Sequence, residues 1–498
     1  MVGLRRKSGR IRKSRTNGKH SDDGDICVMD AAPTYANRFA SAAATVALAF
    51  CVAAVVATLV FAWSDKDPVP LGLLVAAGML PLLLFAGVRT LVWDWRYAFA
   101  AGILIVVLQS ATLRTREIDD KSIDFQILIK LGCLGLMGAL TLSALFVRRL
   151  PLVTAEVVPW TVFLGFTVLN SVHAVQPAMS MVETLSNLVA FLFLYAFVRI
   201  AGPQRLVDAL IVACFLLCCL SIAAYVLDPQ LGRMSDWTNG AFEPTGRLQG
   251  VFGTANSAGA SAGIGILLMV LASKISFRRP MFFVLVAPMA FCLLASNNRM
   301  SLIAVAIGLF YVYLSRGNVG LKLTVAAIIG GFFLLVMTGF SDQILSSVAR
   351  SGSADEITSG TGRSRIWAVV LDLWTEQPLF GYGGGSAKFI LPVHPLLFKA
   401  AAHAHDLYLN VLFADGAVGF LMFGTALVST LRRSAGDRAH ILLAMLIFYL
   451  VYGITEPMIG GLVAFIPLTF YAVLVLVAVA PDQFRHRSTI RAHTPFKL

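Results

Sequence analysis

The side chains best suited to chemistry in this sequence are a histidine pair and a set of arginines. His403 and His405 lie two residues apart in HAHD, directly before a long apolar run. A neutral imidazole has a reference pKa of about 6.5, so it can take a proton from an attacking hydroxyl at neutral pH. The sequence therefore predicts a general base here, His405 first and His403 as the alternative. A plain pair of interfacial histidines is the competing interpretation.

Arginine occurs in each of three polar segments that we expect on one face of a membrane, at 228 to 250, 297 to 299 and 341 to 406. The planar guanidinium fork suits phosphate and carboxylate, and its charge is costly near a membrane without an anionic partner. A diphosphate-bearing lipid is the natural partner. The arginines concerned are Arg247, Arg299, Arg363 and Arg365. The candidate substrate-binding residues are Arg299, Arg365, Asn256, His403 and Glu456. The alternative is that each arginine snorkels to the interface or pairs with a nearby acid.

No common metal or nucleotide signature accompanies these residues. The patterns CxxC, HExxH and GxxxxGK[ST] are missing from the sequence, and the candidate further ligands near the histidines are Asp406 and His394. We therefore predict no metal and no cofactor. The run GYGGG at 381 to 385 is a candidate phosphate cradle, although a lone glycine run is more often a tight connector.

Two further features lie near the histidines. Glu456, in YGITEP at the outer end of an apolar stretch, could orient His405 or an arginine, and a plain helix-end carboxylate is the alternative. The segment SRIWAVVLDLWTEQP, at 364 to 378, repeats apolar residues at three and four positions before a proline. This pattern predicts an amphipathic helix on the membrane surface.

Composition indicates that a polytopic membrane protein positions these residues. Hydrophobic residues make up 58% of the 498 residues and charged residues 13%, and the mean hydropathy is +0.79. These values are far from those of a soluble domain. About fourteen apolar stretches are long enough to cross the hydrocarbon core as helices, or about twelve if the weakest lie at the interface. The stretches are 37 to 63, 69 to 89, 97 to 113, 126 to 147, 157 to 173, 182 to 200, 205 to 227, 251 to 273, 280 to 297, 299 to 315, 321 to 340, 407 to 431, 439 to 456 and 460 to 480.

We therefore expect an all-α transmembrane helical bundle with a large periplasmic loop, 341 to 406, that contains short helices. Basic residues cluster in alternate short loops, which predicts that both termini are cytoplasmic. Four regions follow: a basic disordered arm at 1 to 36, N-terminal helices and a first periplasmic loop at 37 to 244, a catalytic region at 245 to 480, and a basic tail at 481 to 498. The arm serves topology and contact with membrane lipids, and we expect no nucleic-acid partner.

Between 245 and 456 several short motifs follow one another in order. They are RLQGVF with Arg247, SNNRMS with Arg299, GRSRIW with Arg363, PLFGYG, and His405 followed by Asp406, nine residues, and Gly416 with Gly419. In this order the motifs resemble those of the O-antigen ligase and polysaccharide polymerase superfamily of bacterial inner membranes. Ligases of that family have Asn, Ser or Gln where this chain has Asp406.

The resemblance implies a glycosyltransferase that moves a glycan from undecaprenyl diphosphate to a sugar hydroxyl on the periplasmic face, without metal or nucleotide. It implies that His405 is the general base and that Arg247 and Arg363 neutralise charge on the leaving diphosphate, with Arg365 as a substitute. The acceptor is a growing glycan in a polymerase, or lipid A-core in a ligase. Chain-length regulator and export proteins are further expected partners.

The segment LRTREIDDKSIDFQ, at 113 to 126, is similar to exopolysaccharide polymerization proteins of alphaproteobacteria, which favours the polymerase. The rival classes are a flippase for lipid-linked sugars and a structural scaffold of a polysaccharide assembly complex. A transporter places ionisable residues at broken helices in mid-membrane. The expected span centres here are almost free of charge, which favours the enzyme.

Overall fold

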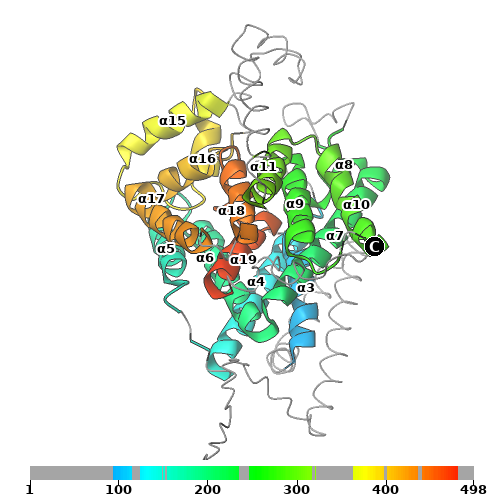
Figure 1. Ribbon diagram of the computed structural model, residues 1–498. Coiled ribbons are helices and arrows are strands. Elements are labelled where there is room, and N and C mark those ends of the chain that lie inside the picture. The colour runs from blue at the N-terminus through cyan, green and yellow to red at the C-terminus, as the bar shows by residue number, and fades with distance from the viewer. Residues whose placement is uncertain are drawn as a thin grey trace, which may run out of the picture.

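Figure 1 shows the computed structural model, which describes residues 94–114, 124–147, 150–151, 154–234, 246–276, 278–316, 320, 363–397, 401–435 and 440–480. This part of the chain is mostly helical and contains no strand, as the all-α prediction requires. The expected arm and tail, and the expected spans at 37 to 63, 69 to 89 and 321 to 340, lie outside the described residues.

The longer helices are α3 (Trp95–Ser110), α4 (Phe125–Val147), α5 (Val158–Asn170), α6 (Pro177–Ala201), α7 (Pro203–Leu227), α9 (Ala255–Leu267), α10 (Pro280–Ala295), α11 (Arg299–Arg316), α15 (Arg363–Glu376), α17 (Leu407–Ser434), α18 (His440–Gly453) and α19 (Phe465–Val479). The short ones are η1 (Ser171–His173), α8 (Pro229–Gly232), η2 (Gly250–Phe252), η3 (Leu268–Ala272), α16 (Ala387–Ile390) and η5 (Leu391–Val393). Each expected span that falls within the described residues therefore coincides with a helix.

Five helical stretches in the described part are long and apolar enough to cross a membrane: Phe125–Leu145, Pro177–Ala201, Pro203–Leu227, Ala255–Ala272 and Leu407–Ser434. Shorter apolar helices, of 10–17 residues, include α3, α10 and α19. The count of twelve to fourteen spans stays a prediction.

Local sequence explains where the helices that carry the site begin. Thr254 caps α9, because its Oγ1 accepts the backbone N–H of Ser257 at 3.0 Å. Asp406 caps α17 in the same way, through the N–H of Leu409 at 2.7 Å. Side-chain oxygens at this position satisfy N–H groups that have no partner within the helix.

The apolar interior joins the early and late helices. The ring of Trp160 (α5) makes edge contacts with Phe423 (α17) and Phe470 (α19), each at a centroid distance of 5.7 Å. Its indole N–H donates to Thr430 Oγ1 at 2.8 Å. Tyr471 OH similarly donates to Asn187 Oδ1 at 2.8 Å, so the Trp160 indole and the Tyr471 hydroxyl both have partners in the interior.

The predicted helix at 364 to 378 is present as α15, which ends directly before Gln377 and Pro378. In Figure 1, α15 and α16 (yellow) lie together beside the N-terminal end of α17. A second, smaller apolar cluster holds them there; it contains Ile366, Val369, Val370, Leu391 and Phe413. This arrangement places the start of α15 next to the residues that precede α17.

Candidate active site

Glu456 is the centre of a polar cluster formed by segments far apart in the sequence. It lies between α18 and α19 and is 9% exposed. One of its carboxylate oxygens, Oε1, accepts from Asn256 Nδ2 at 2.6 Å and from Arg363 Nη2 at 2.9 Å. The Nδ1 atom of His405 lies 3.6 Å from the same oxygen. The structure thus brings the predicted base, one predicted arginine and the candidate carboxylate together.

Arg247 joins the cluster through Asn256. Its Nη2 donates to Asn256 Oδ1 at 3.0 Å, and its Nε donates to the backbone oxygen of Ser296 at 2.9 Å. The two ends of the Asn256 amide therefore connect Arg247 to Glu456, and Glu456 connects onward to Arg363. Two guanidinium groups thus lie in one chain of hydrogen bonds that passes through Asn256 and Glu456, and paired guanidinium groups suit an anionic ligand.

The backbone around Arg247 is fixed by neighbouring segments. The carbonyl oxygen of Arg247 accepts from Met234 N at 2.8 Å, and Leu248 N donates to the carbonyl of Ala295 at the end of α10. Arg247 as a whole residue is 7% exposed. A buried guanidinium needs this degree of hydrogen bonding to offset its desolvation.

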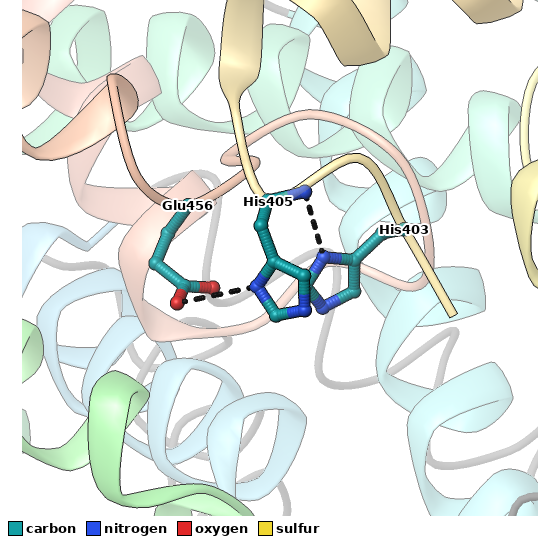
Figure 2. A group of neighbouring side chains, drawn as sticks. All are labelled: His403, His405 and Glu456. Atoms are coloured by element: carbon teal, nitrogen blue, oxygen red, sulfur yellow. Dashed lines mark hydrogen bonds and ion pairs between the residues drawn. The ribbon is translucent and has the colours of Figure 1, made fainter. Parts of the chain in front are cut away.

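Figure 2 shows His405 between Glu456 and His403, with the two imidazole rings close together. Their ring centroids are 4.0 Å apart. The backbone N–H of His405 donates to His403 Nδ1 at 3.3 Å, and His405 has a φ of 49°. The indole N–H of Trp367 (α15) donates to the carbonyl of Ala404 at 3.0 Å.

Burial and charge set the protonation states in this cluster. Burial, with the neighbouring His405, lowers the pKa of His403 to about 4. For Glu456, burial alone would raise the pKa, but His405, His403 and Arg363 outweigh it and the pKa lies below its usual value. At neutral pH the cluster therefore holds a neutral His403 and an ionised Glu456.

Glu456 is held in place through the connector at 454–464 that carries it. Three side-chain amides donate to backbone carbonyls of this connector: Gln109 to Val463 at 2.9 Å, Asn187 to Gly461 at 3.1 Å, and Asn410 to Ile459 at 2.9 Å. These amides come from α3, α6 and α17, so buried polar residues of three helices fix one irregular segment.

The helix that follows the histidines, α17, has a break in its first half, and another segment of the chain binds the backbone at this break. At Gly416 the backbone turns to φ 63° and ψ −165°. The segment around Gly381 inserts there: Tyr382 N donates to the Phe413 carbonyl at 2.9 Å, and Ala417 N donates to the Pro378 carbonyl at 2.8 Å. The PLFGYG motif thus supplies the backbone partners that the helix lacks at the break.

The glycines of GYGGG are packed against protein. A Cβ at Gly381 would lie 2.3 Å from the Phe413 carbonyl oxygen, and one at Gly385 would lie 2.5 Å from Glu183 Oε2. Close approach explains these glycines, and a buried carboxylate beside them opposes phosphate. The structure therefore favours the tight connector over the phosphate cradle.

Arg299 and Arg365 occupy different surroundings from Arg363. Arg365 is exposed. It follows Arg363 by two residues on α15, and a step of two residues rotates a side chain by about 200° around a helix. Arg299 begins α11, directly after Asn298, whose Nδ2 donates to the Asn256 carbonyl at 2.9 Å. Arg299 is therefore the chain neighbour of Asn298, which holds the backbone of Asn256.

The ligand atoms of His403, His405 and Glu456 all lie within 4.8 Å of one another, a spacing that could hold a metal ion. The sequence interpretation did not include Glu456 among the possible ligands. However, Arg363 and Asn256 already donate to Glu456 Oε1. A guanidinium at 2.9 Å repels a metal cation, so the donor set suits an ion-paired carboxylate better than a metal centre.

Residues 283–424 match the family model for O-antigen ligase. The match supports membership of the chain in the O-antigen ligase superfamily and includes α11, α15 and both histidines. No curated protein matches the chain.

Two buried acidic residues beyond the Glu456 cluster were missed by the sequence interpretation. Glu183 forms an ion pair with Lys388, which ties α16 to α6. Asp415 lies at the break in α17, where its Oδ1 accepts from Asn170 Nδ2 at 3.1 Å. Both acids occur within otherwise apolar helices, and an ionisable residue in such a helix is the signal that could have found them.

Proposed function

We propose that this chain is an inner-membrane glycosyltransferase that moves a glycan from undecaprenyl diphosphate to a sugar hydroxyl on the periplasmic face, polymerising exopolysaccharide or O-antigen repeat units. The observation that carries the proposal is the joining of His405, Arg363 and Arg247 around Glu456. A base beside two guanidinium groups suits the attack of a hydroxyl on a sugar whose leaving group is a diphosphate.

His405 is the general base in this proposal. Its imidazole removes the proton from the acceptor hydroxyl while the hydroxyl oxygen forms a bond to the anomeric carbon. The bond from that carbon to the diphosphate oxygen breaks, and the electron pair leaves with the lipid diphosphate. With Nδ1 facing Glu456 at 3.6 Å, a proton on Nδ1 would be stabilised by the carboxylate, and Nε2 would be the basic atom.

Arg247 and Arg363 act on the other side of the reaction. Negative charge grows on the diphosphate as the bond breaks, and positioned guanidinium groups stabilise it without reorganisation. Loss of one such group costs on the order of 3 kcal/mol, or about a hundredfold in rate. Because these arginines supply the charge stabilisation, the proposed reaction needs no metal.

Asn256 and Glu456 position these groups, because their polar atoms bind protein partners. Arg299 remains a candidate substrate contact.

An O-antigen ligase that transfers the glycan to lipid A-core is the second candidate, because the matching family model has that description. The identity of residue 406 does not distinguish a polymerase from a ligase. Its side chain caps α17 through Leu409 N, and Asn or Ser at this position would cap the helix in the same way. The departure from the ligase motif therefore preserves the local structure.

Reconstitution tests the proposal. The purified protein in proteoliposomes receives its lipid-linked repeat unit, with and without lipid A-core, and the products are separated by size. A ladder still attached to undecaprenyl diphosphate supports the polymerase, and a single transfer that requires lipid A-core supports the ligase. Movement of the donor across the bilayer without new glycosidic bonds would overturn the proposal in favour of a flippase.

His405→Ala in the same assay tests the base. We expect at least a hundredfold loss of product formation at equal expression. Full activity in this variant would overturn the assignment of His405.

A further inference from the structure

The backbone of His405 has an unusual conformation for a residue with a side chain. Its φ is 49°, in the left-handed region, which costs free energy for any residue that has a Cβ. The next residue, Asp406, is extended, with φ −161° and ψ 130°, and caps α17. The chain thus turns sharply at the proposed base, and this turn decides where the imidazole points.

Two neighbouring side chains hold this turn. Trp367 donates to the carbonyl of Ala404 at 3.0 Å, on one side of the peptide that leads into His405. His403 accepts the N–H of the same peptide at its Nδ1, at 3.3 Å. Both polar groups of that peptide therefore have side-chain partners. Loss of these two hydrogen bonds would allow the backbone of His405 to leave its left-handed conformation.

The hydrogen bond also fixes the tautomer of His403. An Nδ1 atom that accepts an N–H carries no proton, so the neutral ring has its proton on Nε2. In this state neither nitrogen of His403 is ready to remove a proton from a hydroxyl, because Nδ1 is occupied and Nε2 is a donor.

We propose that His403 is a positioning residue: its Nδ1 accepts the backbone N–H of His405 and holds the base residue in its left-handed conformation. The kinetic part of this proposal rests on the proposed glycosyl transfer by His405. The hydrogen bond and the tautomer do not depend on which reaction is catalysed.

Three variants of the full-length protein in lipid nanodiscs separate positioning from proton transfer. His403→Asn keeps an acceptor, because Oδ1 of Asn takes the place of Nδ1. His403→Gln moves the polar group outward, and His403→Leu removes it. We expect kcat within about threefold of wild type for Asn and a fall of about five- to tenfold for Gln and Leu, the usual worth of one hydrogen bond, with KM little changed.

Two kinetic outcomes would overturn the proposal. If His403→Asn lowers kcat as far as His405→Ala does, His403 takes part in proton transfer and the proposal is wrong. Wild-type kcat in all three variants would equally overturn it. Thermal unfolding of each variant, compared with wild type, shows whether a loss of activity reflects loss of the fold; His403→Gln then serves in place of an unfolded His403→Leu.

A second measurement is independent of activity. In protein labelled with ¹⁵N-histidine, nitrogen chemical shifts report which ring nitrogen carries a proton, and His403→Asn identifies the signals of His403. We expect an unprotonated Nδ1 and a protonated Nε2 at pH 7. A proton on Nδ1 would overturn the proposal even in a fully active enzyme. If the chemical shifts are as expected but no glycosyl transfer is found, the proposed function is wrong and the structural role of His403 still holds.

Discussion

Asn256 Nδ2 donates to Glu456 Oε1 over 2.6 Å, joining residues that are 200 positions apart in the chain. The other end of the same amide accepts from Arg247. An amide can do both, since it carries a donor and an acceptor on one rigid group. The spacing between Arg247 and Glu456 is therefore set by Asn256.

Asn256→Asp tests this bridge. The variant replaces the donor to Glu456 by a second carboxylate, and two carboxylates in contact cannot both ionise without raising the pKa of one. We expect at least a tenfold loss of kcat/KM at pH 7.5, with partial recovery at lower pH as the pair takes up a proton. Thr375→Ala, an exposed position on α15, is the control for expression. Wild-type activity of Asn256→Asp would contradict the bridging role.

Arg363 and Arg365 form a matched pair on one helix. Arg363 pairs with Glu456 at 2.9 Å, whereas Arg365 is exposed. Arg363→Ala should lower kcat about a hundredfold, and Arg363→Lys should recover only part of it, because lysine keeps the charge and loses the fork. Arg365→Ala should stay within about threefold of wild type. Equal losses of kcat at the two positions would contradict the prediction that Arg363, paired with Glu456, matters more than the exposed Arg365.

The sequence predicted the helices well where apolar runs are bounded by polar residues. The run at 205 to 227 is α7, and the repeat at 364 to 378 is α15. Hydropathy could not predict the break in α17, because ADGAVG lies within an apolar run and one span was expected at 407 to 431. The break exists because distant Pro378 and Tyr382 supply its backbone partners.

The candidate site was predicted in its parts but not in its connections. His405, Arg363 and Glu456 were each chosen for their chemistry, and the structure joins Arg363 to Glu456 across 93 positions. Spacing along a chain carries no information about such a pair. The bridging role of Asn256 likewise depends on how α9 lies against the connector that carries Glu456, which only the packing determines.

Gly416 offers a stability test with a control on the same helix. A Cβ at Gly416 would lie 2.3 Å from the Leu379 carbonyl oxygen, and its backbone lies in a region open essentially to glycine. Gly416→Ala should lower the free energy of unfolding by at least about 3 kcal/mol. Gly424 has nothing within 4 Å of a Cβ, so Gly424→Ala should be neutral or stabilise by up to about 1 kcal/mol. Thermal unfolding in detergent compares them; similar melting temperatures for the two variants would contradict the account of the break.

The Glu183–Lys388 ion pair ties α16, and with it the GYGGG segment, to α6. The Glu183 side chain is 7% exposed, so removal of Lys388 leaves a buried charge without its partner. Lys388→Met or Glu183→Gln alone should destabilise the protein by about 3 kcal/mol, and the double variant by less than the sum. Melting temperatures of the four proteins measure the coupling. Additive losses would show that the pair contributes no mutual stabilisation.

The pKa of His403 gives stability a defined dependence on pH. Burial and His405 lower this pKa to about 4 in the folded protein, from about 6.5 when unfolded. Between these two pKa values the unfolded chain binds more protons than the folded protein. The contribution of neutral His403 to the free energy of unfolding is therefore complete above about pH 6.5 and is lost as the pH falls toward 4. The loss amounts to about 3 kcal/mol. Melting temperatures at pH 7.5 and 5 should therefore differ less in His403→Asn than in wild type, while His173→Asn, at an exposed position, should keep the wild-type difference. An unchanged pH dependence in His403→Asn would show that His403 titrates alike in both states.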